Sequence, residues 1–329
     1  MKTILVTGAT GFLGKHLVEQ LRRLGGDARL RVLCRGVSVW DNDPNVEFAR
    51  GDVTTRADVE RAAEGVEEIY HLAGIVSRDP KAAALLYRTH LEGTRNVCEA
   101  ARQKGAPKLV HVSSSGTMAV SREPAVHDET AGYKHDILGE WPYYLSKIFA
   151  EKLALDYFRR YQVPVVVVNP SLILGPGDDR NSSTRDVALF LKGQVMAVPA
   201  GGLSFVDARD AAAALIAAMR AGRPGERYLL GAANWTFREL LERLSQVSGI
   251  RGPKLQPSPE FALRSTRWLR RLYWLAGKTF PLDDVSVKMS ALFWYCDLRK
   301  ARAELGFAPR DPVETLKDTV EDLRSRHSR

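Results

Sequence analysis

Tyr143 and Lys147 are the residues whose types and spacing point most directly to chemistry. They lie four positions apart in a segment that opens with Trp141 and Pro142. We predict a helix from there to about Tyr161, so that both side chains face the same way. A neighbouring ammonium group favours the phenolate of Tyr143 and lowers its pKa towards the range of a general acid-base catalyst. The same spacing also arises by chance on amphipathic helices, so it needs support from the rest of the sequence.

Three consecutive serines, Ser113, Ser114 and Ser115, supply that support. They end the apolar stretch KLVHVS, which begins at Lys108 and is typical of a buried strand. Ligands bind at the carboxyl ends of parallel strands, and a hydroxyl group there can orient a substrate carbonyl beside the tyrosine. The residues alone leave open which serine acts, and a strand-end turn would have the same sequence.

A glycine-rich turn follows the first predicted strand, and an amphipathic helix pattern follows the turn. Gly8 permits a tight turn, and Gly11 lets a pyrophosphate approach the backbone amides at the start of the helix. Gly14 lets the helix lie close to the sheet. A plain glycine-rich turn is the alternative, but the strand-turn-helix context favours a dinucleotide site. The residues expected to contact the dinucleotide are Gly8, Thr10, Gly11, Phe12, Leu13 and Gly14.

The end of the second predicted strand indicates which dinucleotide to expect. An acidic residue there would bind the adenosine ribose hydroxyls, but the strand ends in Cys34 and Arg35 without an Asp or Glu. An arginine can pair with a 2′-phosphate, which favours NADP(H), with NAD(H) as the alternative cofactor. The other interpretation is that Arg35 stacks on adenine or points to solvent. With a nicotinamide cofactor, Lys147 can also hold the ribose.

Short apolar runs alternate with helical patterns and must position these residues. The runs are rich in β-branched residues, as expected of strands buried on both faces of a parallel sheet. We predict a doubly wound α/β domain with a Rossmann fold in residues 1–170, which carries the Ser, Tyr and Lys residues. Residues 171–329 mainly form a smaller C-terminal substrate-binding lobe, interleaved with that core. The predicted strands are residues 3–7, 30–34, 46–48, 68–72, 108–113 and 163–169.

Two helices are predicted in the second region. An alanine-rich one runs from about Asp207 to Ala221. The other begins with a capping box formed by Thr236 and Glu239 and ends at Gly249.

The composition fits a folded protein of a reducing compartment. Hydrophobic residues make up 45% and charged residues 26% of the 329 residues, which excludes a disordered or collagen-like chain. Cys34, Cys98 and Cys296 are far apart, so neither disulfides nor a metal site are expected. The N-terminus lacks a signal-peptide pattern, and no stretch is long and apolar enough for a spanning helix. We therefore expect a cytoplasmic protein.

In their order along the chain, these motifs resemble those of the short-chain dehydrogenase/reductase superfamily in its extended branch, the NAD-dependent epimerase/dehydratase superfamily. The resemblance covers essentially the whole chain and adds the motifs GDV from Gly51 and HLAG from His71. By themselves, Asp52 would be a strand-end capping residue and His71 a core histidine. The further cofactor contacts that the resemblance implies are, from adenine to nicotinamide, Asp52, Val53, Leu72, Ala73, Gly74, Pro170 and Ser171.

The resemblance also assigns the catalytic serine. Counting from Lys108, the family's serine falls on Ser114, and the following Ser-Gly-Thr looks like the Ala-Gly-Thr of the plant dihydroflavonol reductases. Ser115 is the alternative. His90 stands where many extended members carry an asparagine that supports the active site, so that role is not carried over. Motifs in residues 169–177 and 201–207 look more like dihydroflavonol reductases, cinnamoyl-CoA reductases and 3β-hydroxysteroid dehydrogenases than like sugar-nucleotide epimerases.

We therefore predict an NADP(H)-dependent oxidoreductase that reduces a ketone or aldehyde of an apolar substrate. Tyr143 would protonate the alkoxide, Ser114 would donate a hydrogen bond to the same oxygen, and Lys147 would lower the pKa of Tyr143. The alternatives are an NAD-dependent sugar-nucleotide epimerase or dehydratase and, in another class, a cofactor-sensing regulator without chemistry. The small-molecule substrate is expected to contact the weakly patterned regions 77–86, 122–139, 178–193 and 257–284.

The formal net charge of +9 is concentrated in one segment. Residues 251–280 carry seven cations and one anion, but no nucleic-acid-binding motif accompanies them, so we expect no nucleic-acid partner. In residues 261–280, arginines alternate with aromatic and leucine residues at helical spacing, which predicts a cationic side and an aromatic side.

Three interpretations of residues 261–280 stay open. They form a surface helix docked on the core, a lid over an apolar substrate with an anionic handle such as a CoA phosphate, or a helix on an anionic membrane surface. The oligomeric state is also open; homodimers are common in the family that the chain resembles.

Overall fold

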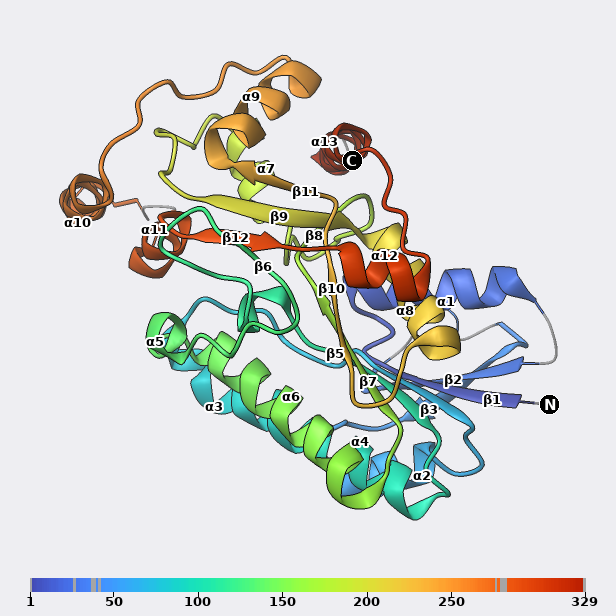
Figure 1. The fold of residues 1–329 in the computed structure, drawn as a ribbon. Helices are drawn as coiled ribbons and strands as arrows, with labels where there is room; N and C mark the ends of the chain where they lie inside the picture. The colour runs from blue at the N-terminus through green and yellow to red at the C-terminus, as the bar shows by residue number, and fades with distance from the viewer. Residues whose placement is uncertain are drawn as a thin grey trace.

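A seven-stranded parallel sheet forms the centre of the structure (Figure 1). The computed structural model describes residues 2–25, 28–36, 40, 43–275, 277–278 and 283–327, with only the backbone of Arg267 and His327. The strand order is β10-β7-β5-β4-β1-β2-β3. The chain adds strands outward in one direction from β1 and in the other direction from β4. Doubly wound sheets bind ligands at such a reversal of strand order. The strands are β1 (Lys2–Thr7), β2 (Ala28–Cys34), β3 (Val46–Arg50), β4 (Glu68–His71), β5 (Lys108–Val112), β7 (Val165–Pro170) and β10 (Arg227–Leu230).

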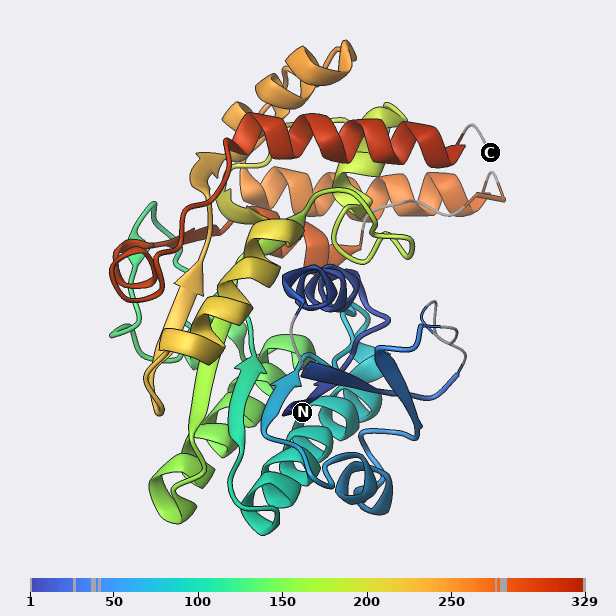
Figure 2. The same cartoon turned by 90° about the vertical axis from the view of Figure 1, so that its right-hand side faces the viewer.

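Helices cover both faces of this sheet (Figure 2). Successive side chains of β1 pack on opposite faces of the sheet. Leu5 belongs to a core with Val97, whereas Val6 belongs to another core with Leu17 and Leu215. This burial on both sides explains why the strands are apolar throughout. One face carries α1 (Phe12–Leu24), α8 (Ala208–Ala221) and α12 (Arg299–Leu305), and the other carries α2 (Arg56–Ala62), α3 (Ala83–Tyr87), α4 (Gly93–Gln103) and α6 (Pro142–Tyr161).

A second, five-stranded sheet forms the smaller lobe. Its strands are β6 (Val126–His127), β8 (Leu172–Leu174), β9 (Gly202–Asp207), β11 (Ala233–Thr236) and β12 (Phe293–Cys296). The helices α7 (Arg185–Leu191), α9 (Phe237–Ser248) and α13 (Pro312–His327) share a core with this sheet, which includes Phe190, Phe205, Leu244 and Leu316. The remaining helices are α5 (His135–Leu138), α10 (Pro259–Leu275) and α11 (Asp284–Ser290).

The predicted α/β fold is confirmed, and so are the individual helices of the second region. Helix α8 begins after Asp207, whose side chain accepts a hydrogen bond from the amide of Arg209. Helix α9 has the predicted capping box between Thr236 and Glu239 and ends at Gly249, where φ is 72°. Within the described residues, no helix is both long and apolar enough to cross a membrane.

The two predicted regions interleave at their boundary. Strand β10 follows residue 170 but extends the main sheet, whereas β6 precedes it but joins the second sheet. Of the predicted segment 261–280, helix α10 covers the part up to Leu275. Residues 276, 279 and 280 lie outside the described residues.

Candidate active site

A cleft of about 1510 Å³ opens at the carboxyl ends of the central strands. Its wall contains the glycine-rich turn after β1, residues at the ends of β4, β5 and β7, and the start of α6. Ligands of doubly wound sheets bind in this position. The predicted site residues that line the cleft are Gly8, Thr10, Gly11, Phe12, Leu13, Gly14, Leu72, Gly74, Ser114, Tyr143, Lys147, Pro170 and Ser171, together with the alternative Ser115.

Close backbone contacts shape the glycine-rich turn. Gly8 has a φ of 75°, in the left-handed region that favours glycine, and a Cβ there would lie 2.6 Å from the amide nitrogen of Ala73. A Cβ on Gly14 would lie 2.2 Å from the carbonyl oxygen of Gly8. Gly11 is the N-cap of α1 and has no side chain to cap the helix, so the first amides of α1 are open to an anion. The turn therefore fits the pyrophosphate of a dinucleotide.

Two buried hydroxyl groups in the cleft wall also fit a polar ligand. Among the described residues, the Oγ atoms of Ser113 and Ser171 are buried without a hydrogen-bond partner. A buried hydroxyl group is costly unless a ligand or water satisfies it. Ser171 immediately follows β7, at the end of the cleft where the nicotinamide is expected. The residues present thus fit a nicotinamide dinucleotide.

Four of the predicted cofactor residues do not line the cleft: Arg35, Asp52, Val53 and Ala73. Arg35 follows β2; its side chain is 74% exposed, and its Nη1 lies 3.8 Å from Oδ2 of Asp52. Val53 is buried, and the amide of Ala73 donates a hydrogen bond to the hydroxyl of Thr7 at 3.3 Å. The structure thus brings Arg35 and Asp52 together, outside the cleft wall.

Asp52 and His71 have the structural roles inferred from the sequence. Oδ1 of Asp52 accepts hydrogen bonds from the amide and hydroxyl of Thr54 and so caps the following turn. His71 is buried, and its ring nitrogens contact the hydroxyls of Thr7 and Thr94 at 2.7 and 3.0 Å. Burial lowers the pKa of His71 to about 3, with Lys147 adding to the decrease. Its imidazole is therefore neutral at physiological pH.

Tyr143 and Ser114 both line the cleft, and Ser114 interacts with the phenol of Tyr143. Tyr143 lies in the first turn of α6, and Ser114 precedes a short 3₁₀ helix after β5. Burial raises the pKa of Tyr143 to about 12 because the phenolate loses hydration, and the interaction with Ser114 offsets part of this increase. Of the two candidate serines, Ser114 is the one that the structure pairs with Tyr143.

Lys147 is buried in the cleft wall, one turn after Tyr143. Its Nζ donates a hydrogen bond to the carbonyl oxygen of Val112 at 3.1 Å, at the end of β5. Burial lowers the pKa of Lys147 to about 8, and the negative charge of Glu151 opposes the decrease. The expectation that Lys147 lowers the pKa of Tyr143 stays a prediction. The pKa of Tyr143 responds to burial and to Ser114, and the ammonium group is directed at the backbone of β5.

His90 links the first turn of α6 to the loop that follows β4. Its Nε2 accepts a hydrogen bond from the amide of Ile75 at 3.0 Å, so Nδ1 carries the proton and donates to Oγ of Ser146 at 2.8 Å. Ser146 in turn donates to the carbonyl oxygen of Tyr143. Burial holds the pKa of His90 well below its ordinary value, and Lys147 adds to this effect. The neutral imidazole therefore holds the backbone amide of Ile75 directly and the backbone carbonyl of Tyr143 through Ser146.

Glu151 is a fully buried carboxylate that was not predicted from the sequence. Its Oε2 accepts a hydrogen bond from Nδ2 of Asn169 at 2.8 Å, and its Oε1 accepts one from the hydroxyl of Tyr133 at 3.0 Å. Nδ2 of Asn169 also donates to the carbonyl oxygen of Ser114 at 3.2 Å. Glu151 thus helps to hold Ser114 in place. Its position four residues after Lys147, on the same face of α6, is the sequence signal that points to it.

The outer part of the cleft is mainly apolar. Tyr144 stacks on Trp294 with ring centroids 5.0 Å apart. An ion pair between Arg78 and Asp186, at 2.9 Å, joins the two lobes at this wall. The apolar side chains of the wall include Leu172, Leu189, Met196, Leu240, Phe261 and Met289.

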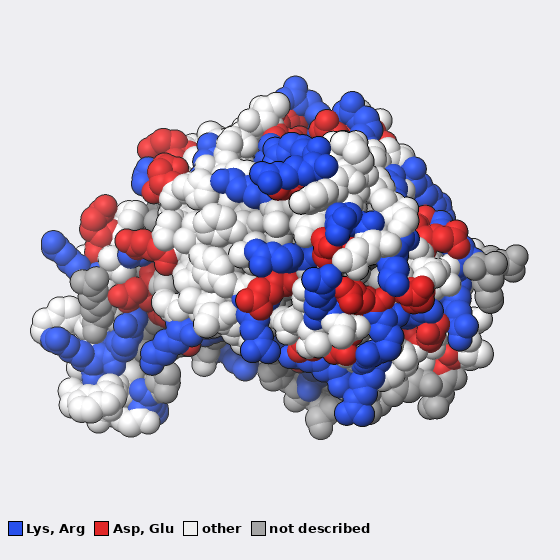
Figure 3. All heavy atoms as spheres, turned by 90° about the horizontal axis from the view of Figure 1, so that it is seen from below, with Lys and Arg blue, Asp and Glu red and all other residues white. Residues whose placement is uncertain are grey.

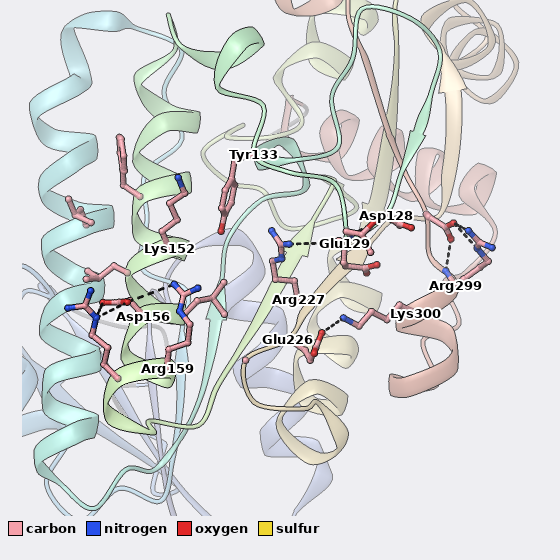
Figure 4. A pocket seen from close by; sticks show the side chains of 18 residues that line it. Asp128, Glu129, Tyr133, Lys152, Asp156, Arg159, Glu226, Arg227, Arg299 and Lys300 are labelled. Atoms are coloured by element: carbon pink, nitrogen blue, oxygen red, sulfur yellow. Dashed lines mark hydrogen bonds and ion pairs between the residues drawn. The ribbon is translucent and has the colours of Figure 1, made fainter.

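Three of the four regions predicted to contact substrate contribute to this cleft: 77–86, 178–193 and 257–284. Residues 122–139 do not line it, because β6 draws this segment beside β12 in the second sheet. Residues 128–130 and Tyr133 line a separate groove of about 980 Å³ between α6 and residues 297–300 (Figure 4). Charged side chains of the groove pair with one another, as Lys300 does with Glu226.

Comparisons with known proteins agree with this geometry. A family model described as "NAD dependent epimerase/dehydratase family" matches residues 4–231. Over 324 residues the chain is 32% identical to "Putative dihydroflavonol 4-reductase" of Synechocystis sp., covering 96% of this chain and 92% of the relative. It is 30% identical over 330 residues to "Sterol demethylase protein B" of Methylococcus capsulatus, covering 98% and 99%.

Among solved structures, the crystal structure of gox2253 matches with a TM-score of 0.83 and 29% identity, and the match covers 99% of both chains. The fold, the order of the motifs and these matches agree along nearly the whole chain. The chain belongs to the NAD-dependent epimerase/dehydratase family, the extended branch of the short-chain dehydrogenases/reductases.

Proposed function

We propose that this family member is an NADP(H)-dependent reductase that converts a ketone or aldehyde of an apolar substrate into an alcohol, with Tyr143 as the general acid. The observation that carries the proposal is that Tyr143 and Ser114 line the same largely apolar cleft, where Ser114 lowers the pKa of the Tyr143 phenol. A nucleotide sugar would leave many of its polar groups without partners against such a wall. Two relatives whose names refer to a dihydroflavonol and to a sterol support the same substrate class.

The protonation states of the site favour reduction. The raised pKa of Tyr143 keeps the phenol protonated at neutral pH, so it can donate a proton to the alkoxide that develops on the substrate oxygen. Ser114 would donate a hydrogen bond to the same oxygen. Lys147 carries a charge below its pKa of about 8 and would hold the cofactor ribose. NADPH, when bound, supplies the hydride.

The proposed preference for NADP(H) rests on Arg35. Its guanidinium group is exposed just beyond β2, where a 2′-phosphate would form a charge-assisted pair with it. Asp52, two residues after the end of β3, lies beside Arg35. Comparing the affinities for NADPH and NADH therefore tests this part of the proposal directly.

Incubation of the purified protein with NADPH and a panel of ketones and aldehydes tests the proposed reaction. We expect stoichiometric oxidation of NADPH and an alcohol product identified by mass spectrometry. Tightly held NAD in the purified protein, with conversion of a sugar nucleotide and no net consumption of NADPH, would identify an epimerase or dehydratase instead. NADPH binding without turnover of any compound would favour a cofactor-sensing regulator.

A further inference from the structure

The outer face of α10 carries an exposed apolar stripe. Phe261, Trp268, Leu272 and Leu275 follow one another at intervals of seven, four and three residues, which places them on one side of the helix. All four side chains are exposed, Trp268 to 68% and Leu275 to 73%. Scattered apolar side chains are normal on a protein surface, but a contiguous stripe of this kind marks an interaction site.

Two arginines border this stripe. Arg264 and Arg271 are exposed and lie within one helical turn of Trp268. Within the described part of the chain, neither forms an ion pair or a side-chain hydrogen bond. Arg270, by contrast, pairs with Asp284 at 2.6 Å and so joins α10 to α11. The bordering guanidinium groups are thus available to an external anionic surface.

The adjacent face of α10 belongs to the substrate cleft, and Phe261 lies at the border and lines the cleft as well. Ala262, Ser265, Thr266 and Leu269 line the cleft wall. Figure 1 shows α10 projecting at the left edge of the molecule. In the view from below, the projecting part at the left carries basic side chains beside uncharged ones (Figure 3). The exposed stripe and the cleft wall thus lie on neighbouring faces of the same helix.

We propose that the outer face of α10 docks on an anionic lipid bilayer, so that the cleft opens beside the membrane that supplies its substrate. The second half of this statement rests on the proposed reduction of an apolar carbonyl. Tryptophan, phenylalanine and leucine side chains enter the boundary between head groups and acyl chains, while arginines remain at the level of the phosphates. The net charge of +9 adds attraction at longer range.

A second copy of this chain fits the same face less well. A symmetric contact would bring the arginine borders of two copies together, and α10 carries four arginines but one acidic residue, Glu260 in its first turn, to pair with them. Like charges that face each other across an interface are costly. An anionic bilayer offers phosphates to both arginines and an apolar interior to the stripe.

Sedimentation of the full-length protein with lipid vesicles tests the proposal. The vesicles are phosphatidylcholine alone or phosphatidylcholine mixed with phosphatidylglycerol, and neither NADPH nor substrate is present. We expect binding to the anionic vesicles only, and weaker binding as salt is added. The double variant R264Q/R271Q should bind about 25-fold more weakly, because each basic residue near an anionic surface contributes about fivefold.

Two further variants separate charge from apolar insertion. W268S/L272S keeps the charge but removes apolar area, so it should also bind more weakly. R220Q/R302Q is the matched control: it removes two charges from exposed arginines on α8 and α12, which lie on the other side of the molecule from α10 (Figure 1). This control should retain vesicle binding.

Three results would overturn the proposal. The first is equal vesicle binding by the wild type and both α10 variants. The second is a dimer, measured by light scattering, that either α10 variant converts to a monomer, since the face would then pack on a second copy. The third is a higher KM for a CoA thioester in R264Q/R271Q with unchanged vesicle binding, which would assign the arginines to a soluble substrate.

A separate measurement keeps this test independent of the proposed reaction. Vesicle binding is scored without turnover, so its failure leaves the reductase proposal standing. The substituted residues Arg264, Trp268, Arg271 and Leu272 do not line the cleft. Both α10 variants should therefore oxidise NADPH at the wild-type rate with a water-soluble ketone in the absence of vesicles.

Discussion

Replacing Glu151 tests whether the buried network behind the cleft positions Ser114. The carboxylate of Glu151 is fully buried, accepts hydrogen bonds from Asn169 and Tyr133, and lies 3.6 Å from the guanidinium group of Arg227. Glu151→Leu leaves these buried groups without their acceptor, which costs about 1–3 kcal/mol for each donor. We expect the free energy of unfolding to fall by about 3–5 kcal/mol, the range for breaking a buried ionic network.

Glu151→Gln should rescue most of this loss. The amide keeps one oxygen for Asn169, and the hydroxyl of Tyr133 can accept a hydrogen bond from the new amide nitrogen. Only the contribution of the charge to the hydrogen bonds is lost, so we expect a decrease of about 1–2 kcal/mol. The order wild type, Glu151→Gln, Glu151→Leu is therefore the expected order of stability.

Activity should follow the same order through kcat. Asn169 also donates to the carbonyl oxygen of Ser114, so loss of Glu151 frees both groups to shift. A small misplacement of a catalytic group costs on the order of tenfold to a hundredfold in rate, and we expect such a fall in kcat for Glu151→Leu. The KM for NADPH should change less than kcat, because Glu151 does not contact the glycine-rich turn and acts on the cofactor site through the charge that raises the pKa of Lys147.

Urea unfolding followed by circular dichroism, and steady-state kinetics with NADPH, measure these effects. Glu99→Gln is the control, because Glu99 also accepts a hydrogen bond from a tyrosine, Tyr157 at 3.2 Å, but belongs to a surface ion pair with Arg102. It should cost less than about 1 kcal/mol. If Glu151→Leu unfolds like the control and keeps the wild-type kcat, the positioning role of Glu151 is refuted.

Three further outcomes are expected. Gly14→Ala should weaken NADPH binding about tenfold by calorimetry, because the new Cβ would lie 2.2 Å from the carbonyl oxygen of Gly8 and overpacking costs about 1–3 kcal/mol; an unchanged Kd would contradict the role of the turn. The rate of reduction should fall as pH rises through about 8, because Lys147 loses its charge there while Tyr143, with a pKa of about 12, stays protonated; a flat profile across that pH would show that the charge of Lys147 is not needed. Arg35→Ala should raise the Kd for NADPH at least about tenfold, the worth of one charge-assisted hydrogen bond, and leave the Kd for NADH unchanged; equal effects on both cofactors would place Arg35 away from the 2′-phosphate.

Features that depend on neighbouring residues could be predicted from the sequence. The glycine-rich turn, the shared face of Tyr143 and Lys147 and the capping box of α9 each involve residues within one or two turns of one another. Glu151 belongs to the same class, since it continues the spacing of Tyr143 and Lys147 on α6. Its burial gives it a role that the spacing alone does not reveal.

Features that depend on the path of the chain could not be predicted. Trp294 reaches Tyr144 only because β12 joins the second sheet beside β9, and the same sheet removes residues 122–139 from the cleft through β6. The direction of the Lys147 ammonium group likewise depends on the path of the chain. Helical spacing places the side chains of Tyr143 and Lys147 on one face, but the carbonyl oxygen of Val112 directs Nζ to β5.

The most direct test of the account is the single-turnover rate of Tyr143→Phe with NADPH and a reducible ketone, measured together with the Kd for NADPH. The substitution removes the hydroxyl group that interacts with Ser114 and leaves the ring that packs edge-on against His90. We predict that the rate falls by roughly 10²- to 10⁴-fold, the usual contribution of a positioned proton donor, while the Kd for NADPH stays within about twofold of the wild-type value. A variant that reduces the ketone at the wild-type rate would contradict the assignment of Tyr143 as the general acid.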